Sequence, residues 1–284
     1  MIGKDNDLGY GIMRVDEDQP WAPMHLGQPL WNFVNALFFE YGIAAYDLEL
    51  RGAVARGRTK DPKFQREAKA VVAKIRRQVT KDYVVHPTLS AATGSFVPTV
   101  LANLTANTVR NLWSHSVIMC GHFPEGVQTF AKSSIEGETR GEWYLRQMIG
   151  SANISGSKAM HLMTGNLSHQ IEHHLFPDLP SNRYAEIAPR VRDLMDRYEL
   201  RYVTGPLHHQ VASAWKQVIT LSLPNGAWAS AKKDPVGVAG QGVAAASRYG
   251  ASTASWLLRT ATATTALAVT GVTARWSRGQ RQRR

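Results

Sequence analysis

A long stretch without charged side chains limits most strongly how this chain of 284 residues can fold. From Tyr83 to Val109 the sequence contains no Asp, Glu, Lys or Arg. The stretch is long enough to cross a bilayer as a helix, although it is rich in Thr, Asn and Ala and contains Pro98. We therefore predict a membrane-spanning helix that continues past Arg110 to Gly121.

A shorter apolar segment, Pro29 to Tyr46, comes before this stretch and carries a single charge, Glu40. Its length is at the lower limit for a spanning helix, so we expect it either to span the membrane or to be re-entrant. The alternative for both segments is a pair of buried helices in a soluble core, which would suit the slightly negative mean hydropathy of the chain. We favour a multi-pass or partly re-entrant membrane protein with large cytoplasmic parts.

The net charge of +11 is concentrated in two places. Residues Arg51 to Asp82 contain eleven Lys or Arg against three acidic residues, and the terminal sequence ARWSRGQRQRR contains five Arg and no acid. Because basic loops face the cytoplasm, the first block predicts a cytoplasmic, solvated helix that touches anionic headgroups. Neither block alternates basic with aromatic side chains, and no zinc-finger, helix-turn-helix or RNP pattern is present, so we expect no nucleic-acid binding.

The remaining sequence predicts a cytoplasmic helical cap and a tail. After Gly121 charged and apolar residues are mixed, as expected of such a cap. A helix is predicted from Ser181, with Ser181 or Asn182 as its N-cap. Its apolar face would consist of Ile187, Val191, Leu194, Met195 and Tyr198. Residues 229–284 are low in complexity and predict a mostly disordered tail.

The segment TGNLSHQIEHHLFPDLPSN, residues 164–182, contains the most distinctive pattern in the chain. On a helix, Gln170, His173 and His174 fall within an arc of about 100°, whereas His169 lies to one side. Imidazole is a preferred ligand of iron, zinc and copper, so we predict that His173 and His174 are metal ligands. The alternative is an exposed polar loop whose histidines have no role or take up zinc adventitiously.

A second polar group lies at the end of the long uncharged stretch. If the helix there persists to Gly121, then Asn111, His115 and His122 lie within about 40° of one another on one face. Polar residues at a membrane boundary are costly unless they serve a site or satisfy one another, and both interpretations stay open here. The other histidines, at segment edges or in loops, have no partner at ligand spacing; they are His25, His86, His161, His208 and His209.

Two segments, HQIEHHLFPDLPSNRYAEIAPRV and NLWSHSVIMCGHFPEG, resemble the membrane fatty acid desaturases, in particular the bacterial acyl-CoA and linoleoyl-CoA desaturase-like branch. The match extends from near Gly3 to about Pro224. The resemblance implies an all-α fold, with integral membrane helices beneath a cytoplasmic helical cap. It also implies that residues 1–228 are the C-terminal part of a desaturase domain whose site faces the cytoplasm.

The resemblance further implies a set of iron ligands. Members of the family hold two iron ions on histidines from three sequence boxes. The third box has the form QxxHH and matches Gln170, His173 and His174, which makes the two histidines ligands. A further histidine after the last span is usually a ligand, for which His122 is our first choice and His115 our second. The residues expected to orient the ligands are Gln170, Asn111, Glu172 and Asn166.

This chain departs from the family pattern in one respect. The first box, HxxxH, and the second box, HxxHH, are absent from the sequence. The ligand set is then about half complete, and an incompletely ligated iron is held weakly or not at all. We therefore expect the chain to be inactive by itself and an HxxHH sequence to lie shortly upstream of Met1.

The family chemistry is the oxygen-dependent introduction of a double bond into a fatty acyl chain. Removing hydrogen from an unactivated methylene requires dioxygen activated at a redox metal. The expected partners are an acyl-CoA or acyl-lipid substrate, membrane lipids and an electron donor. Since the sequence has no flavin or nicotinamide fingerprint, that donor would be a separate ferredoxin or cytochrome with its reductase. The alternatives are a fatty acyl hydroxylase on the same scaffold and a non-catalytic, membrane-anchored fragment.

Overall fold

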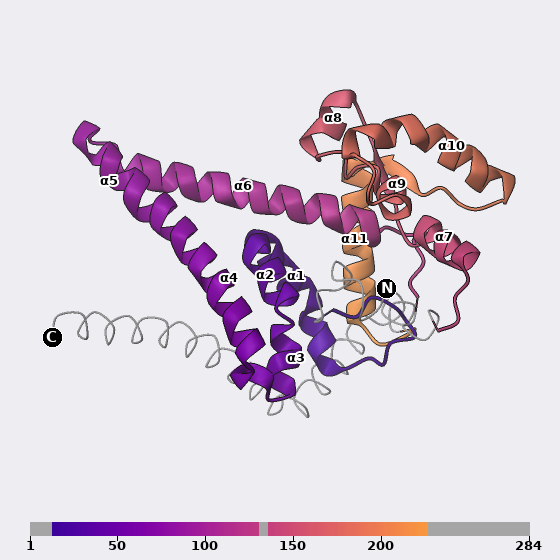
Figure 1. Ribbon diagram of the computed structural model, residues 1–284, viewed down its shortest axis with the longest axis horizontal. Helices are drawn as coiled ribbons and strands as arrows, with labels where there is room; N and C mark the ends of the chain where they lie inside the picture. Colours follow the sequence, from indigo (N-terminus) through magenta and orange to yellow (C-terminus); the bar gives the residue numbers. More distant parts are fainter. Residues whose placement is uncertain (1–12, 131–135, 227–284) are drawn as a thin grey trace. The chain divides into compact units, whose positions relative to one another are not determined.

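The computed structural model describes residues 13–130 and 136–226, so the predicted tail at 229–284 lies outside the described residues (Figure 1). In the described part, helices make up nearly all regular structure, and this confirms the all-α prediction. The described residues divide into two compact units, one of residues 13–39 and 111–226 and the other of residues 40–110.

The unit formed by residues 40–110 contains most of α2 (Phe39–Asp47), then α3 (Leu50–Ala55) and the basic helix α4 (Pro62–Thr80). Helix α4 begins where Asp61 accepts a hydrogen bond from the backbone N–H of Lys63 and where Pro62 supplies a fixed φ angle. Phe64 and Ala68 of α4 are buried and pack against Ala53 of α3. A helix in the basic block is therefore confirmed.

The long uncharged stretch forms a helical hairpin in this unit. From α4 the chain continues through a π-helical turn, η4 (Lys81–Val85), and α5 (His86–Ser90), and then reverses before α6 (Phe96–His122) (Figure 1). Gly94 adopts φ +73°, a left-handed conformation that glycine reaches without strain. Across the hairpin, the Asn103 side chain donates to the Asp82 carbonyl at 2.5 Å, and Asn107 donates to the Asp82 carboxylate at 3.1 Å.

The prediction of one continuous span from Tyr83 to Gly121 is wrong, because the turn before Phe96 divides the stretch into two helices. Pro98 lies in the first turn of α6, where its missing N–H removes no helical hydrogen bond. The segment Pro29 to Tyr46 is also divided. It forms α1 (Gln28–Leu37) and α2, with non-helical angles at Phe38, φ −116° and ψ 32°.

Within residues 13–130 and 136–226, no helix combines the length and the apolar character needed to cross a bilayer.

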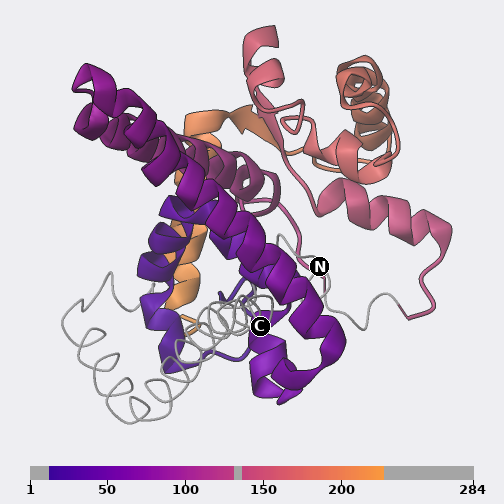
Figure 2. The ribbon, with the colours of Figure 1, turned by 60° about the vertical axis from the view of Figure 1, so that its left-hand side comes forward.

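The other unit combines α1 and the second half of α6 with several short elements. These are α7 (Arg140–Ile149), β1 (Asn153–Ser155), α8 (Lys158–Met163), α9 (Gln170–Leu175), α10 (Tyr184–Arg197), β2 (Thr204–Pro206) and α11 (Leu207–Ser222). The two strands pair in parallel, with Asn153 opposite Thr204. Both views show α7, α9 and α10 grouped together (Figures 1 and 2). One buried cluster joins these three helices and consists of Met148, Ile171, Leu175, Val191 and Met195.

The helix predicted after Ser181 is confirmed as α10, but two of its details differ from the prediction. A 3₁₀ turn at Ser181–Arg183 leads into it, and the N-cap position, Arg183, has no side-chain capping bond. The buried residues of α10 are Tyr184, Val191 and Met195. Two residues of the predicted apolar face, Leu194 and Tyr198, are instead 40% and 67% exposed, while Val191 and Met195 pack in the buried cluster with α9.

A buried arginine fixes the C-terminal end of α11. The Arg14 guanidinium is 2% exposed and donates to the carbonyls of Leu221 and Leu223 at 3.3 and 3.0 Å. It also donates to the Glu17 and Gln19 carbonyls, at 2.8 and 2.9 Å. Carbonyls at a helix end lack partners within the helix, so this positive charge satisfies them and complements the helix dipole.

Candidate functional site

Helix α9 carries the glutamine and the two histidines of the QxxHH sequence, as the helical spacing predicted. Ile171 and Leu175 on its inner face are 0% and 6% exposed and belong to the buried cluster. This packing fixes the rotation of α9 about its axis. His173 and His174 are consequently held on its outer, half-buried face.

Two histidines from different helices meet at Gln170. The rings of His122, the last residue of α6, and His174 are 5.1 Å apart. The Gln170 side-chain nitrogen lies 3.4 Å from His122 Nε2 and 3.1 Å from His174 Nε2. Gly121 makes this approach possible, because a Cβ atom there would stand only 2.8 Å from Gln170 Cγ. Both imidazoles therefore direct Nε2 to the same point.

The other ring nitrogens of the α9 histidines contact two residues that the sequence analysis missed. His174 Nδ1 lies 3.2 Å from the Gln147 side-chain oxygen on α7, and His173 Nδ1 lies 3.0 Å from the Tyr184 hydroxyl on α10. Tyr184 is 2% exposed, and burial raises its pKa, so the phenol is neutral and keeps its proton. No motif or spacing marks these residues, because both are brought to α9 by the packing of other helices.

The structure places His115 and Asn111 at α1 and not with the other site residues. His115 Nε2 lies 3.0 Å from the Asn32 side-chain oxygen, and the ring meets Phe39 edge to face. The Asn111 side chain donates to the Leu37 carbonyl at 2.9 Å. These two residues share a face of α6, as predicted, but that face satisfies its polar groups against a neighbouring helix.

Glu172 lies in the first turn of α9 and is fully buried, and its side chain contacts β1 and Tyr202 and not the two imidazoles. Its carboxylate accepts from the Asn153 side chain and from the Tyr202 hydroxyl, each at 2.8 Å. Burial and the Glu172 charge raise the pKa of Tyr202, so this phenol stays protonated and donates. The Asn153 oxygen in turn accepts from the backbone N–H of Ile171 at 2.8 Å. Asn153 and Glu172 thus anchor the first turn of α9.

Asn166 and His169 occupy the segment that leads into α9. Asn166 has φ +64° and contacts the Ser181 hydroxyl at 3.5 Å, so it shapes a turn. The His169 ring stacks on His161 at 4.6 Å, and burial lowers its pKa to about 4. Among the residues that the structure describes, none provides a hydrogen-bond partner for His169 Nε2.

The two imidazoles that meet at Gln170 can be compared with the ligands of a metal site. His122 and His174 present Nε2 atoms to one point and so fit two ligand positions of an imidazole-rich site. The contacts at Nδ1 of His173 and His174 are of the kind that orient metal-binding histidines. In the described part of the chain, however, no group of three or more His, Cys, Asp or Glu is arranged to hold a metal ion. The residues therefore fit part of a ligand set.

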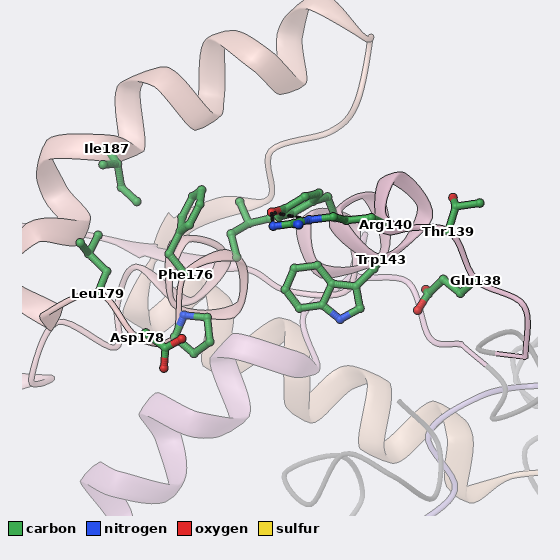
Figure 3. A pocket seen from close by; sticks show the side chains of 11 residues that line it. Glu138, Thr139, Arg140, Trp143, Phe176, Asp178, Leu179 and Ile187 are labelled. Atoms are coloured by element: carbon green, nitrogen blue, oxygen red, sulfur yellow. Dashed lines mark hydrogen bonds between the residues drawn. The ribbon is translucent and has the colours of Figure 1, made fainter.

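A mostly apolar groove of about 1000 Å³ lies in the same unit (Figure 3). It is bounded by α7 and by the segment from the end of α9 into α10, and Trp143 and Phe176 line it from these two elements. At one end the Glu138 carboxylate receives two hydrogen bonds from the Arg146 guanidinium, at 2.6 and 2.8 Å. The groove shares α7 and α9 with the histidine contacts.

Comparison with known proteins identifies the relatives of this chain. Residues 3–206 match the family model described as fatty acid desaturase. The chain is 45% identical over 227 residues, 79% of its length and 53% of the relative's, to a Mycobacterium tuberculosis protein named NADPH-dependent stearoyl-CoA 9-desaturase. It is 30% identical over 111 residues, 39% of its length and 23% of the relative's, to human fatty acid desaturase 3. No solved structure matches the chain.

Proposed function

Because this chain belongs to the fatty acid desaturase family, we propose that it is part of an oxygen-dependent fatty acyl desaturase. The convergence of His122 Nε2 and His174 Nε2 on the Gln170 amide carries the proposal, because this pair comes from the two segments that resemble the family. We assign His122, His173 and His174 as iron ligands. The chain spans about half the length of the curated relatives that it matches most extensively.

The bound iron would supply the oxygen activation that hydrogen removal from an unactivated methylene requires. Residues of this chain orient the imidazoles that would bind the iron. The buried face of α9 fixes the direction of the two adjacent imidazoles, and Gln170 holds His122 and His174 within reach of one ion. His115 fits this role less well, since its Nε2 contacts Asn32.

A centre with two iron ions needs more donors than the described residues bring together. We therefore propose that the residues described here contribute one part of the ligand set. The expectation that this chain alone binds iron weakly and is inactive belongs to the same proposal.

The substrate we propose is an acyl-CoA or acyl-lipid, because the mycobacterial relative is named a stearoyl-CoA desaturase. The groove beside α9 would suit an apolar ligand, since its lining includes Trp143, Phe176 and Leu179. The same relative is named as NADPH-dependent. For this chain we propose a separate protein as electron donor, either a ferredoxin or a cytochrome with its reductase.

We also propose that the protein is membrane-associated through the hairpin of α5 and α6, with the site on the cytoplasmic side. Several large apolar side chains of this hairpin are exposed, among them Leu89 at 74%, Val97 at 62% and Leu101 at 56%. Asn103 and Asn107 satisfy the polar groups between the two helices, as polar side chains do in membrane helix pairs. A lipid environment would cover the exposed apolar residues.

The test is a fatty acid profile of a desaturase-deficient host that expresses the natural gene product. Replacing His173 or His174 with Ala should abolish the unsaturated product while the protein remains in the membrane fraction. His208 and His209, an adjacent pair at the start of α11, provide the matched control and should tolerate the same change. Equal losses from both pairs would overturn the ligand assignment.

A further inference from the structure

The hydrogen bonds around His174 determine which of its ring nitrogens carries the proton. The Gln147 side-chain oxygen can only accept, so His174 Nδ1, at 3.2 Å from it, must be the N–H donor. The Gln170 side-chain nitrogen can only donate, so His174 Nε2, at 3.1 Å, must offer its lone pair. The two contacts agree on one tautomer, in which Nε2 is free of its proton.

The residues on both sides of Gln147 in α7 are anchored by packing or hydrogen bonds. The side chain of Met148 is 8% exposed and packs in the buried cluster with Ile171 and Leu175 of α9. On the other side, Arg146 forms its paired hydrogen bonds with Glu138, and the two side chains are 12% and 8% exposed. These contacts hold the backbone of α7 on both sides of Gln147, whose half-buried side chain reaches His174 Nδ1 at 3.2 Å.

We propose that Gln147 is a positioning residue that fixes the tautomer and the ring orientation of His174. The inference rests on the proposed function, because the lone pair at Nε2 is the one that a metal ion would take. Gln147 acts through His174 and touches neither metal nor substrate. A hydrogen bond of ordinary net strength shifts such an equilibrium by about two- to tenfold.

The test compares two substitutions in the full chain. Gln147→Met keeps the length and flexibility of the side chain and removes the oxygen acceptor, whereas Gln147→Glu keeps an acceptor oxygen. Gln217→Met on α11 is the matched control, since Gln217 lies on a different helix from Gln147 and His174. The melting temperature of each variant reports whether the chain still folds.

Two measurements follow on the same proteins. In the metal-free chain with ¹⁵N-labelled histidine, long-range ¹H–¹⁵N spectra report the tautomer of His174, whose signals are assigned by their loss in His174→Ala. We expect the Nδ1–H form in the parent and in Gln147→Glu, and a shift toward the Nε2–H form in Gln147→Met. Titration with Co²⁺ as a spectroscopic probe should show an affinity about two- to tenfold lower in Gln147→Met than in the parent, in proportion to the loss of the competent tautomer.

The outcomes separate this inference from the proposed function. If His174 has the Nε2–H form in the parent, or keeps the Nδ1–H form in a folded Gln147→Met, the inference is wrong. It is also wrong if Co²⁺ affinity falls in His174→Ala and is unchanged in Gln147→Met, and in that case the ligand assignment stands. If His174→Ala itself leaves Co²⁺ binding unchanged, the ligand assignment fails and the inference fails with it.

Discussion

Asn153 should be the most sensitive polar residue beneath the histidine helix. Its side chain is buried, donates to Glu172 at 2.8 Å and accepts from the Ile171 N–H at 2.8 Å. Asn153→Ala removes a hydrogen bond to a charged group, worth about 1.5–3 kcal/mol, and leaves a buried N–H unpaired, at about 1–3 kcal/mol. We expect a loss of about 3–5 kcal/mol in the free energy of unfolding, a large fraction of the about 5–15 kcal/mol of a typical domain.

Urea denaturation of the purified chain measures this loss. Asn182→Ala is the control, because Asn182 is exposed and should change stability by less than about 0.5 kcal/mol. Asn153→Asp distinguishes the two contacts: it keeps the acceptor for Ile171 but sets a second carboxylate against Glu172. Its defect should shrink as pH falls, since one shared proton restores a donor between the two groups. A loss below about 1 kcal/mol in Asn153→Ala, with an unchanged m-value, would refute the reasoning.

Three further predictions concern single residues. Arg14→Met should lower the free energy of unfolding by about 2–4 kcal/mol and increase hydrogen exchange in the last turn of α11, and Arg14→Lys should recover little because one ammonium cannot replace the guanidinium. Tyr184→Phe should cost about 0.5–1.5 kcal/mol in stability and, measured with Co²⁺, about tenfold in metal affinity, because His173 loses its Nδ1 partner. The pKa of His169 is lowered from 6.5 to about 4, so the unfolded chain binds more protons between these values. Stability should therefore be lost as pH falls from 6.5 toward 4, by at most about 3 kcal/mol, and a denaturation series should show a smaller loss for His169→Gln.

The uncharged stretch shows that composition alone does not predict the position of a turn. The absence of charge from Tyr83 to Val109 predicted a membrane-spanning helix, and Leu89 and Val97 in this stretch are largely exposed. It does not reveal where the chain turns. The turn lies at Gly94, which adopts the left-handed conformation between α5 and α6. The turn residue was visible in the sequence, but its effect depends on contacts between helices.

The site was predictable only where its residues are close in sequence. Helical spacing brought Gln170 and His174 to one face of α9, as the structure has them. His122 lies on a different helix, and only the resemblance to a family connected it with α9. Gln147 and Tyr184 could not be found, because they reach the histidines through the buried packing of α7 and α10 on α9.

Contacts within this chain hold the histidine helix on two sides. Its inner face is held by Ile171 and Leu175 in the buried cluster, and its first turn by Asn153. The Gln170 amide already lies between the two imidazoles that the ion would join. If the proposed ligand assignment holds, these contacts would fix the direction of the imidazoles toward the ion, as the hydrogen bonds of metal-binding histidines do.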